Sequence, residues 1–297
     1  MRVPLFFALP GSEHACERIS RCAGGEVGQL EGRGFPDGES YVRVASDVSG
    51  RETVLVCTLN RPNDKVLPLL FVADALRELG ASGVGLVAQY LAYMRQDKRF
   101  HPGEAVTSRS LATLLSERVD WLVTVDPHLH RISHLSDIYS IPAIAAHSST
   151  DVGRWIAENV KDPLIIGPDE ESSQWVRDVA LTARAPSTVL VKARRGDMDV
   201  VESIPNLYDY RARVPVLVDD IVSTGRTMLA ALDHLREHGA PNAWCVGVHA
   251  VFANDAYTSL QSAGAAGVVT TNTIPHESNR IDVQPTIAIH VMQRLRA

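Results

Sequence analysis

The sequence has 297 residues, 45% of them hydrophobic, and a formal net charge of −6 at pH 7. A chain of this length can bury a large core, and two domains of moderate size are its natural division. Because the net charge is negative, the protein as a whole would not attract the phosphates of a nucleic acid. No apolar run approaches the roughly 20 residues of a membrane helix. We therefore expect a globular protein that binds neither nucleic acid nor a membrane.

The cysteines are scattered along the chain and show no Cys-x-x-Cys spacing: Cys16, Cys22, Cys57 and Cys245. This pattern indicates neither a zinc site nor a dense disulfide framework, and it favours buried thiols in a reducing compartment. The apolar N-terminal stretch is too short for a signal peptide. These features predict a cytoplasmic protein.

Apolar runs of strand length recur along the chain, from VPLFFAL near the N-terminus to AWCVGVHAV near residue 249. Several are β-branched, as in strands that are buried on both faces. Helical patterns lie between them, with apolar residues at spacings of three and four. The alternation predicts an α/β fold of two domains, residues 1–145 and 146–297, each with a mainly parallel sheet flanked by helices.

Two polar segments stand out in the first half of the chain. Residues 34–44, GFPDGESYVRV, predict a turn that joins two strands, because proline and glycine favour tight turns. Residues 95–99, RQDKR, concentrate charge, and such a run on its own is most often a solvated turn. Arg95 could nevertheless donate two hydrogen bonds to a phosphate.

The predicted strand WLVTVD ends in Asp126 and is followed by His128, His130 and His134. A histidine cluster can bind zinc, but no cysteine partner and no His-Glu-x-x-His pattern accompany this one. Mg²⁺ takes few protein ligands and suits phosphate chemistry better. We expect His130 and His134 to be surface or helix residues.

Two predicted strands in the second half also end in charged residues. PLIIGPD ends in Asp169, a second candidate metal ligand, and STVLVKARR ends in a basic cluster that contains Lys192 and Arg194. Residues 195–213 are polar and poorly patterned, and they predict an exposed loop. A cluster of cations before such a loop could meet the charge that develops during phosphoryl transfer.

The run VPVLVDDIVSTGRTM delivers Asp219 and Asp220 to the end of a predicted strand, where ligands bind in open α/β sheets. Adjacent carboxylates are costly unless a cation or hydroxyl groups lie against them. Residues 223–227, here called the STGRT loop, combine hydroxyls, a glycine and a helix start, so their backbone N–H groups can bind a phosphate. Simple capping is the alternative. The complete run favours a ribose-5-phosphate site.

The run from 214 to 228 resembles the phosphoribosyl-diphosphate (PRPP) loop that type I phosphoribosyltransferases share with the ribose-phosphate diphosphokinases, which make PRPP. Other segments resemble the diphosphokinases specifically and stand in the family's order: FPDGE, YLAYMRQDK, TVDPH, GPDEE and LVKARR. The resemblance implies two type I phosphoribosyltransferase-like domains. It also implies transfer of the β,γ-diphosphoryl group of Mg·ATP to the C1 hydroxyl of ribose 5-phosphate, which gives AMP and PRPP.

The same resemblance assigns roles to individual residues. It implies a homo-oligomer, a dimer or a hexamer, in which the FPDGE element reaches ATP across a subunit interface. ATP would contact Phe35, Asp37, Glu39, Arg95, Gln96 and Asp97, and Mg²⁺ would bind His128 and Asp169. Lys192 and Arg194 would stabilise the transition state. Ribose 5-phosphate would be held by Asp219, Asp220, Ser223, Thr224, Gly225, Arg226 and Thr227.

The chain departs from the family pattern at three places. Pro36 replaces a serine, residues 170–173 replace glycines, and Arg226 stands where the family usually has a second glycine. A phosphoribosyltransferase that consumes PRPP is one alternative, although it gives no role to FPDGE or RQDKR. A non-catalytic nucleotide-binding paralogue that regulates an active partner is another, and the presence of Lys192 and Arg194 argues against it.

Overall fold

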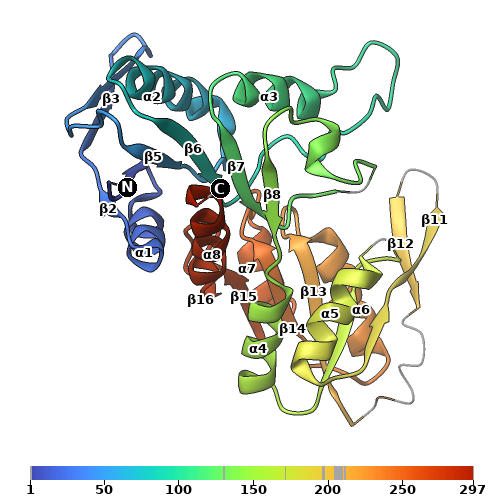
Figure 1. The fold of residues 1–297 in the computed structure, drawn as a ribbon. Coiled ribbons are helices and arrows are strands. Elements are labelled where there is room, and N and C mark those ends of the chain that lie inside the picture. Colours follow the sequence, from blue (N-terminus) through green and yellow to red (C-terminus); the bar gives the residue numbers. More distant parts are fainter. Residues whose placement is uncertain are drawn as a thin grey trace. The chain divides into compact units, whose positions relative to one another are not determined.

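The computed structural model describes residues 2–129, 131–170, 172–195, 198–203, 210 and 212–296, and for residues 191–195 and 198–203 it describes the backbone alone. The chain folds into two compact units (Figure 1). The first comprises Met1–His147 with Gln284–Ala297, and the second comprises Ser148–Val283. Each is an α/β unit with a parallel sheet and flanking helices, which confirms the predicted fold class.

The first unit is built on a six-stranded sheet in the order β2-β1-β5-β6-β7-β8. Every neighbouring pair of these strands is parallel. The strands β6 and β7 are buried along their whole length, which explains why their sequences are continuous apolar runs. The strands are β1 (Leu5–Ala8), β2 (Glu26–Val27), β5 (Glu52–Val56), β6 (Gly83–Ala88), β7 (Trp121–Val125) and β8 (Ala143–Ala146).

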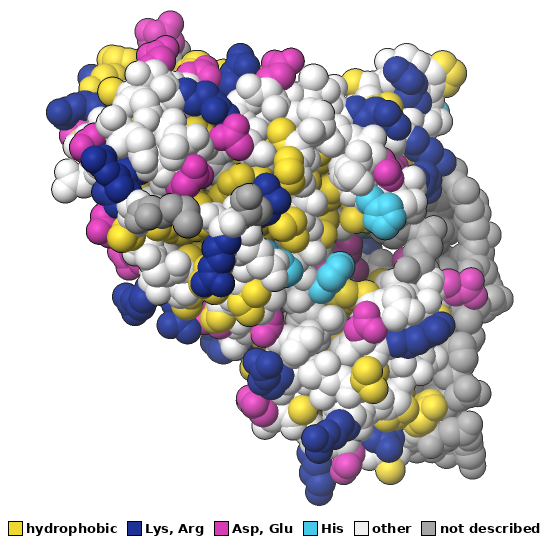
Figure 2. All heavy atoms as spheres, viewed as in Figure 1, with side chains coloured by type: hydrophobic (Ala, Val, Ile, Leu, Met, Phe, Trp, Pro, Cys, Tyr) yellow, Lys and Arg dark blue, Asp and Glu magenta, His cyan; other side chains and the backbone are white. Residues whose placement is uncertain are grey.

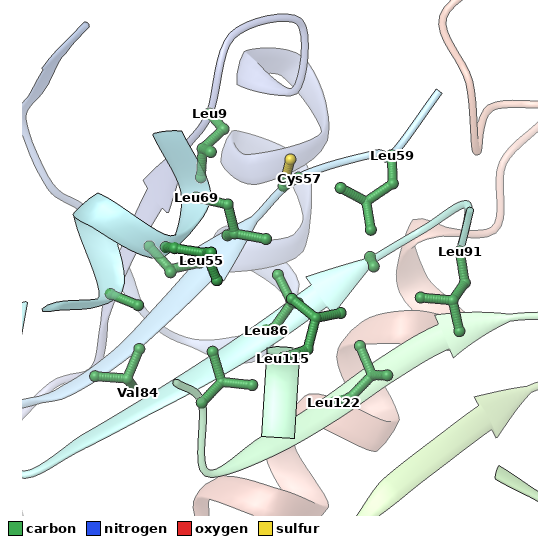
Figure 3. Packing of buried hydrophobic residues seen from close by; sticks show 14 of the residues in the cluster. Leu9, Leu55, Cys57, Leu59, Leu69, Val84, Leu86, Leu91, Leu115 and Leu122 are labelled. Carbon is green, nitrogen blue, oxygen red and sulfur yellow. The ribbon is translucent and has the colours of Figure 1, made fainter. Parts of the chain in front are cut away.

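Helices α2 (Val66–Glu78) and α3 (Thr107–Ser116) supply leucines to the core of this unit. Figure 3 shows Leu69 and Leu115 from these helices beside leucines of the central strands, Leu55, Leu86 and Leu122. These helical leucines are almost fully buried. Apolar spacings of three and four in the sequence therefore mark the face that each helix turns to the sheet.

Helix α8 (Gln284–Leu295) packs against α1 (Glu13–Ala23), β7 and β8 in the first unit. Its residues Ile287, Ala288 and Val291 are completely buried. The sequence division at residues 145 and 146 lies close to the boundary between His147 and Ser148. The expected C-terminal domain differs at its end, because burial of this apolar face places residues 284–297 in the first unit.

An antiparallel hairpin of β3 (Leu30–Gly34) and β4 (Ser40–Val44) stands apart from this sheet. The backbone N–H of Phe35 donates to the carbonyl of Glu39 at 2.7 Å, and Gly38 closes the turn with φ at 93°. A positive φ is readily adopted by glycine. The turn predicted between two strands is therefore correct. Short 3-10 helices, η1 (Pro62–Asp64) and η2 (Leu135–Asp137), follow β5 and β7.

The second unit is built on a parallel six-stranded sheet in the order β10-β9-β13-β14-β15-β16. Its strands are β9 (Pro163–Gly167), β10 (Ser187–Val189), β13 (Val214–Ile221), β14 (Trp244–His249), β15 (Gly267–Thr271) and β16 (Asn279–Ile281). Its helices are α4 (Ser149–Asn159), α5 (Ser173–Ala183), α6 (Arg226–Glu237) and α7 (Ala256–Ser262). The strand order repeats that of the first unit, so β9 corresponds to β1 and β13 corresponds to β5.

The expected exposed loop over residues 195–213 is wrong in part. The strands β11 (Val191–Arg195) and β12 (Met198–Ser203) form a two-stranded antiparallel ribbon. Hydrogen bonds between the two backbones form this ribbon. Polar residues can make these bonds as well as apolar ones, so the ribbon has no apolar pattern in the sequence. Residues 196, 197, 204–209 and 211 of the expected loop lie outside the described residues.

Cys16, Cys57 and Cys245 are buried, and Cys22 is exposed. Burial raises the pKa of each buried thiol to about 12, so these cysteines stay protonated and behave as small apolar side chains. Among the described helices, none combines the length and the apolar character needed to cross a membrane.

Candidate active site

Three carboxylates approach one another at one edge of the second sheet. Asp219 and Asp220 lie at the end of β13, and Asp169 follows the neighbouring parallel strand β9. Desolvation raises the pKa of Asp219 well above its ordinary value, and the charges of Asp220 and Asp169 raise it further. Neighbouring parallel strands end at the same edge of a sheet, and this places Asp169 in the same site as Asp219 and Asp220.

Such a site favours a cation or hydroxyl donors, because either would offset the repulsion between ionised carboxylates. Carboxylate oxygens are ligands that Mg²⁺ prefers, and the ion usually keeps waters and takes further oxygens from a substrate's phosphates. The donor set therefore fits magnesium. In the described part of the chain, no three side chains of His, Cys, Asp or Glu form a group that could hold a metal by themselves.

The STGRT loop leads from β13 into α6. Gly225 occupies the N-cap position in a left-handed conformation with φ at 68°, and its carbonyl accepts the N–H of Leu229 at 2.8 Å. Gly225 has no side chain with which to cap the first turn, so the N–H groups there can serve an anion. Arg226 is the first residue of α6 and is exposed. The glycine accounts for the turn, and the arginine needs only ordinary helical geometry.

Asp169 also shapes the start of α5. Its Oδ1 accepts the backbone N–H of Ser172 at 3.0 Å, and its carbonyl accepts the Ser172 hydroxyl at 2.7 Å. Glu170 is exposed. In this chain the departure from the family's glycines therefore creates a serine-closed turn in front of α5.

In the first unit, the segment with Arg95, Gln96 and Asp97 lies between β6 and α3. The Gln96 side chain accepts the Thr107 hydroxyl at 3.1 Å, and the Gln96 carbonyl accepts the Ser108 hydroxyl at 3.1 Å. These contacts join the segment to the first turn of α3. Arg95 is exposed. The structure thus anchors Gln96 and leaves the Arg95 side chain at the surface, where it could meet a phosphate.

Asp97 is only 8% exposed, and its carboxylate contacts Arg131. Sequence reasoning missed Arg131, which stands among the histidines after β7 and there resembles a solvated arginine. The partner of Arg131 is 34 residues away in the chain, so only tertiary structure reveals the pair. Contact between Asp97 and ATP stays a prediction, because the observed contacts are those of a residue that holds its segment in place.

The tip of the β3–β4 hairpin exposes Phe35, Asp37 and Glu39. Asp37 Oδ1 accepts the N–H of Glu39 at 3.2 Å. The guanidinium of Arg33 lies 4.6 Å from the centre of the Phe35 ring and 4.9 Å from that of Tyr41. An aromatic ring stiffened by a cation–π contact and open to solvent can stack on a base. Nothing in the sequence pattern singles out Arg33 for this contact.

The histidines near the end of β7 bear on the expected metal site. His128 follows β7 in the first unit and is partly buried, whereas Asp169 belongs to the second unit. Nearby, Nδ1 of His147 lies 3.1 Å from Oδ1 of the buried Asp126, another contact that sequence reasoning missed. His134 is exposed and is the N-cap residue of η2, as expected of a surface residue. His130 lies outside the described residues.

Lys192 and Arg194 lie on β11, where the backbone alone is described. Their positions pair with Val201 and Asp199 of β12. The two residues are two apart on one strand, so they share a face of the ribbon.

On the surface drawn in Figure 2, acidic and basic side chains are interspersed on both units.

Comparison with known families matches residues 5–118 to the N-terminal domain of ribose phosphate pyrophosphokinase and residues 134–286 to the phosphoribosyl transferase domain. The crystal structure of phosphoribosylpyrophosphate synthetase from Mycobacterium smegmatis has the same fold, with a TM-score of 0.85 at 23% identity over 99% of each chain. Fold and site thus define a two-domain protein of the phosphoribosyltransferase-like class.

Curated relatives narrow this class to one family. The ribose-phosphate pyrophosphokinase of Methanopyrus kandleri is 35% identical over 91% of this chain and 92% of its own length. Ribose-phosphate pyrophosphokinase 2 of Archaeoglobus fulgidus is 35% identical over 95% of this chain and 98% of its own. The chain belongs to the ribose-phosphate pyrophosphokinase family, as its sequence motifs predict.

Proposed function

We propose that this protein is a ribose-phosphate diphosphokinase that converts ATP and ribose 5-phosphate into AMP and PRPP. The C1 hydroxyl of the sugar attacks the β-phosphorus of ATP, the bond from that phosphorus to the AMP oxygen breaks, and the hydroxyl proton is released. The observation that carries the proposal is the group of Asp169, Asp219 and Asp220 next to a helix N-terminus with a glycine at its N-cap. The family membership supports it.

Asp219 and Asp220 would accept hydrogen bonds from the sugar hydroxyls and so orient C1 for attack. The STGRT loop, through Ser223, Thr224, Gly225, Arg226 and Thr227, would hold the 5-phosphate with backbone N–H groups and hydroxyls. Hydroxyl donors would also offset the desolvation and the repulsion by Asp220 that raise the pKa of Asp219. Binding energy and orientation therefore come from the same residues.

ATP would be bound by Phe35, Asp37, Glu39, Arg95, Gln96 and Asp97, with its base on the exposed Phe35 ring. Lys192 and Arg194 would meet the negative charge that develops on the phosphate oxygens. His128 and Asp169 would hold Mg²⁺, which when bound to the phosphates withdraws charge from them. The match of residues 5–118 to the pyrophosphokinase N-terminal domain favours this reaction over consumption of PRPP.

The proposal includes a homo-oligomer, a dimer or a hexamer, and a cytoplasmic location. The exposed hairpin tip, which holds a T-shaped pair of Phe35 and Tyr41 at the surface, supports contact with a second copy. Mass photometry at nanomolar and micromolar concentrations would test the assembly, and a monomer at all concentrations would contradict it.

The direct test is an assay of purified protein with Mg²⁺, ATP and ribose 5-phosphate, in which AMP and PRPP are both quantified. We expect equal amounts of the two products and no AMP without the sugar. Asp220→Asn should abolish product formation, whereas Asp178→Asn, a change at an exposed carboxylate of α5, should not. Failure to release AMP, or release that requires a nucleobase, would refute the proposal.

A further inference from the structure

The turn after β14 is bonded to the chain that enters the STGRT loop. The backbone N–H of Phe252 donates to the carbonyl of Val222 at 2.8 Å, and that of Ala253 donates to the carbonyl of Ser223 at 3.0 Å. In the other direction, the N–H of Val222 donates to the carbonyl of His249 at 3.1 Å. The residues immediately before Thr224 and Gly225 are thus held from outside their own segment.

This double contact depends on an unusual backbone at Phe252. Its φ is 35°, in the left-handed region, and Asn254 has a φ of 56°. In an extended chain successive N–H groups point to opposite sides, so two neighbouring N–H groups can reach one segment only where the backbone turns. A left-handed conformation is unfavourable for a residue with a large side chain unless its surroundings impose it. Something must therefore hold Phe252 in place.

Two aromatic side chains provide that support. The Phe252 ring centre lies 5.2 Å from that of Tyr257 on α7 and 4.6 Å from that of His276, and Tyr257 and His276 meet edge to face at 4.7 Å. His276 is itself fixed, because its Nδ1 accepts the N–H of Ser278 at 3.1 Å. Aromatic contacts at these separations are favourable beyond their burial. We name Phe252, Tyr257 and His276 the aromatic trio.

Helix α7 supports the loop at a second point. A Cβ placed on Gly225 would lie 3.6 Å from Leu260 and 3.7 Å from Ala256, so α7 packs directly against this glycine. Tyr257 of the aromatic trio belongs to the same helix. The helix therefore fixes both the turn at Phe252 and the glycine at which α6 begins.

We propose that Phe252 is a positioning residue for ribose 5-phosphate: held by the aromatic trio, its turn fixes the backbone of Ser223 and so the STGRT loop in the geometry that receives the 5-phosphate. This inference rests on the proposed function. It predicts a defect that is specific to the sugar phosphate, because the residues proposed to bind ATP belong to the first unit and none lies on this turn.

The test compares Phe252→Ala, Phe252→Gly and Phe252→Tyr with the wild type, by calorimetric titration of ribose 5-phosphate alone and by steady-state kinetics. Phe252→Ala should weaken sugar-phosphate binding and raise its KM about tenfold, with the KM for ATP unchanged. Phe252→Tyr, which keeps the ring, should behave as wild type. Phe252→Gly should fall between them, because glycine adopts the left-handed turn freely but lacks the ring.

The control is Phe71→Ala, which truncates a partly exposed phenylalanine of α2 in the first unit and should leave both constants unchanged. Should Phe252→Ala fail to fold by circular dichroism, Phe252→Leu and Tyr257→Leu provide the same comparison with less loss of volume. Equal rises in both KM values, or unchanged binding of ribose 5-phosphate, would overturn the inference. A wild type that binds the sugar phosphate but releases no AMP would refute the proposed function alone, and one that does not bind it would refute both.

Discussion

The guanidinium Nη1 of Arg131 lies 3.3 Å from Oδ1 of Asp97, and the backbone N–H of Arg131 donates to Oδ2 of the same carboxylate at 3.3 Å. The carboxylate is buried, whereas the arginine side chain is about half exposed. The pair joins the segment that contains Arg95 and Gln96 to the chain after β7. Because a buried carboxylate without a partner is costly, Arg131 supports this segment in addition to the contacts that Gln96 makes with α3.

Arg131→Leu should therefore lower the free energy of unfolding by about 1 kcal/mol, a value reduced for the solvent that reaches the arginine. It should also raise the KM for ATP several-fold and leave that for ribose 5-phosphate unchanged. Urea unfolding and steady-state kinetics measure the two effects. Arg236→Leu breaks an exposed ion pair with Asp233 on α6 and should change stability by less than about 0.5 kcal/mol. Equal effects of the two variants would contradict the assigned role.

Asp219→Asn should stabilise the ligand-free protein near neutral pH while it abolishes activity. The raised pKa means that folded Asp219 binds a proton more tightly than the unfolded chain does. The stability that comes from this tighter proton binding is therefore fully present below the ordinary carboxyl pKa of about 3.9. It is lost as the pH rises through the pKa of Asp219 in the folded protein. Thermal unfolding at pH 5 and pH 8 should show an advantage of the asparagine variant that grows with pH. An advantage that shrinks or stays constant would contradict this reading.

Mg²⁺ should raise the melting temperature of the wild type, because it binds the folded state and offsets the repulsion among the carboxylates. The increase should be smaller in Asp219→Asn, which lacks one of these charges, and unchanged in Asp178→Asn. Removal of the metal with EDTA should stop AMP release in the assay. A metal-dependent increase of the same size in all three proteins would place the ion elsewhere.

Arg226→Gly should leave the KM for ribose 5-phosphate within about twofold of the wild-type value, because an exposed cation contributes little in water. The left-handed position belongs to Gly225, so a second glycine is not needed for the turn. The variant should instead lose some stability, because glycine is unfavourable within a helix. A rise of fivefold or more in the KM would show that the arginine binds the phosphate.

The central strands β5, β6, β7, β9, β13 and β14 were predictable because each is a continuous apolar run, and the position of Asp219 and Asp220 near a strand end follows from the run before them. Other features depend on contacts between distant parts of the chain. The place of α8 follows from burial of Ile287 and Val291, and the support of Asp97 follows from Arg131. The β11–β12 ribbon escaped prediction because backbone pairing between polar residues leaves no periodic signal.

Because the two sheets have the same strand order, the strand end that carries Asp219 and Asp220 can be compared with the corresponding strand end in the first unit. The strands β5 and β13 hold corresponding places in their sheets, yet β5 is followed by Cys57 and Thr58, whereas β13 ends in two carboxylates. The first unit thus forms this strand end without adjacent carboxylates, and the second carries them. The electrostatic cost of the paired carboxylates therefore falls on the second unit. Selection for stability can therefore act on the strand end after β5 without changing the paired carboxylates after β13.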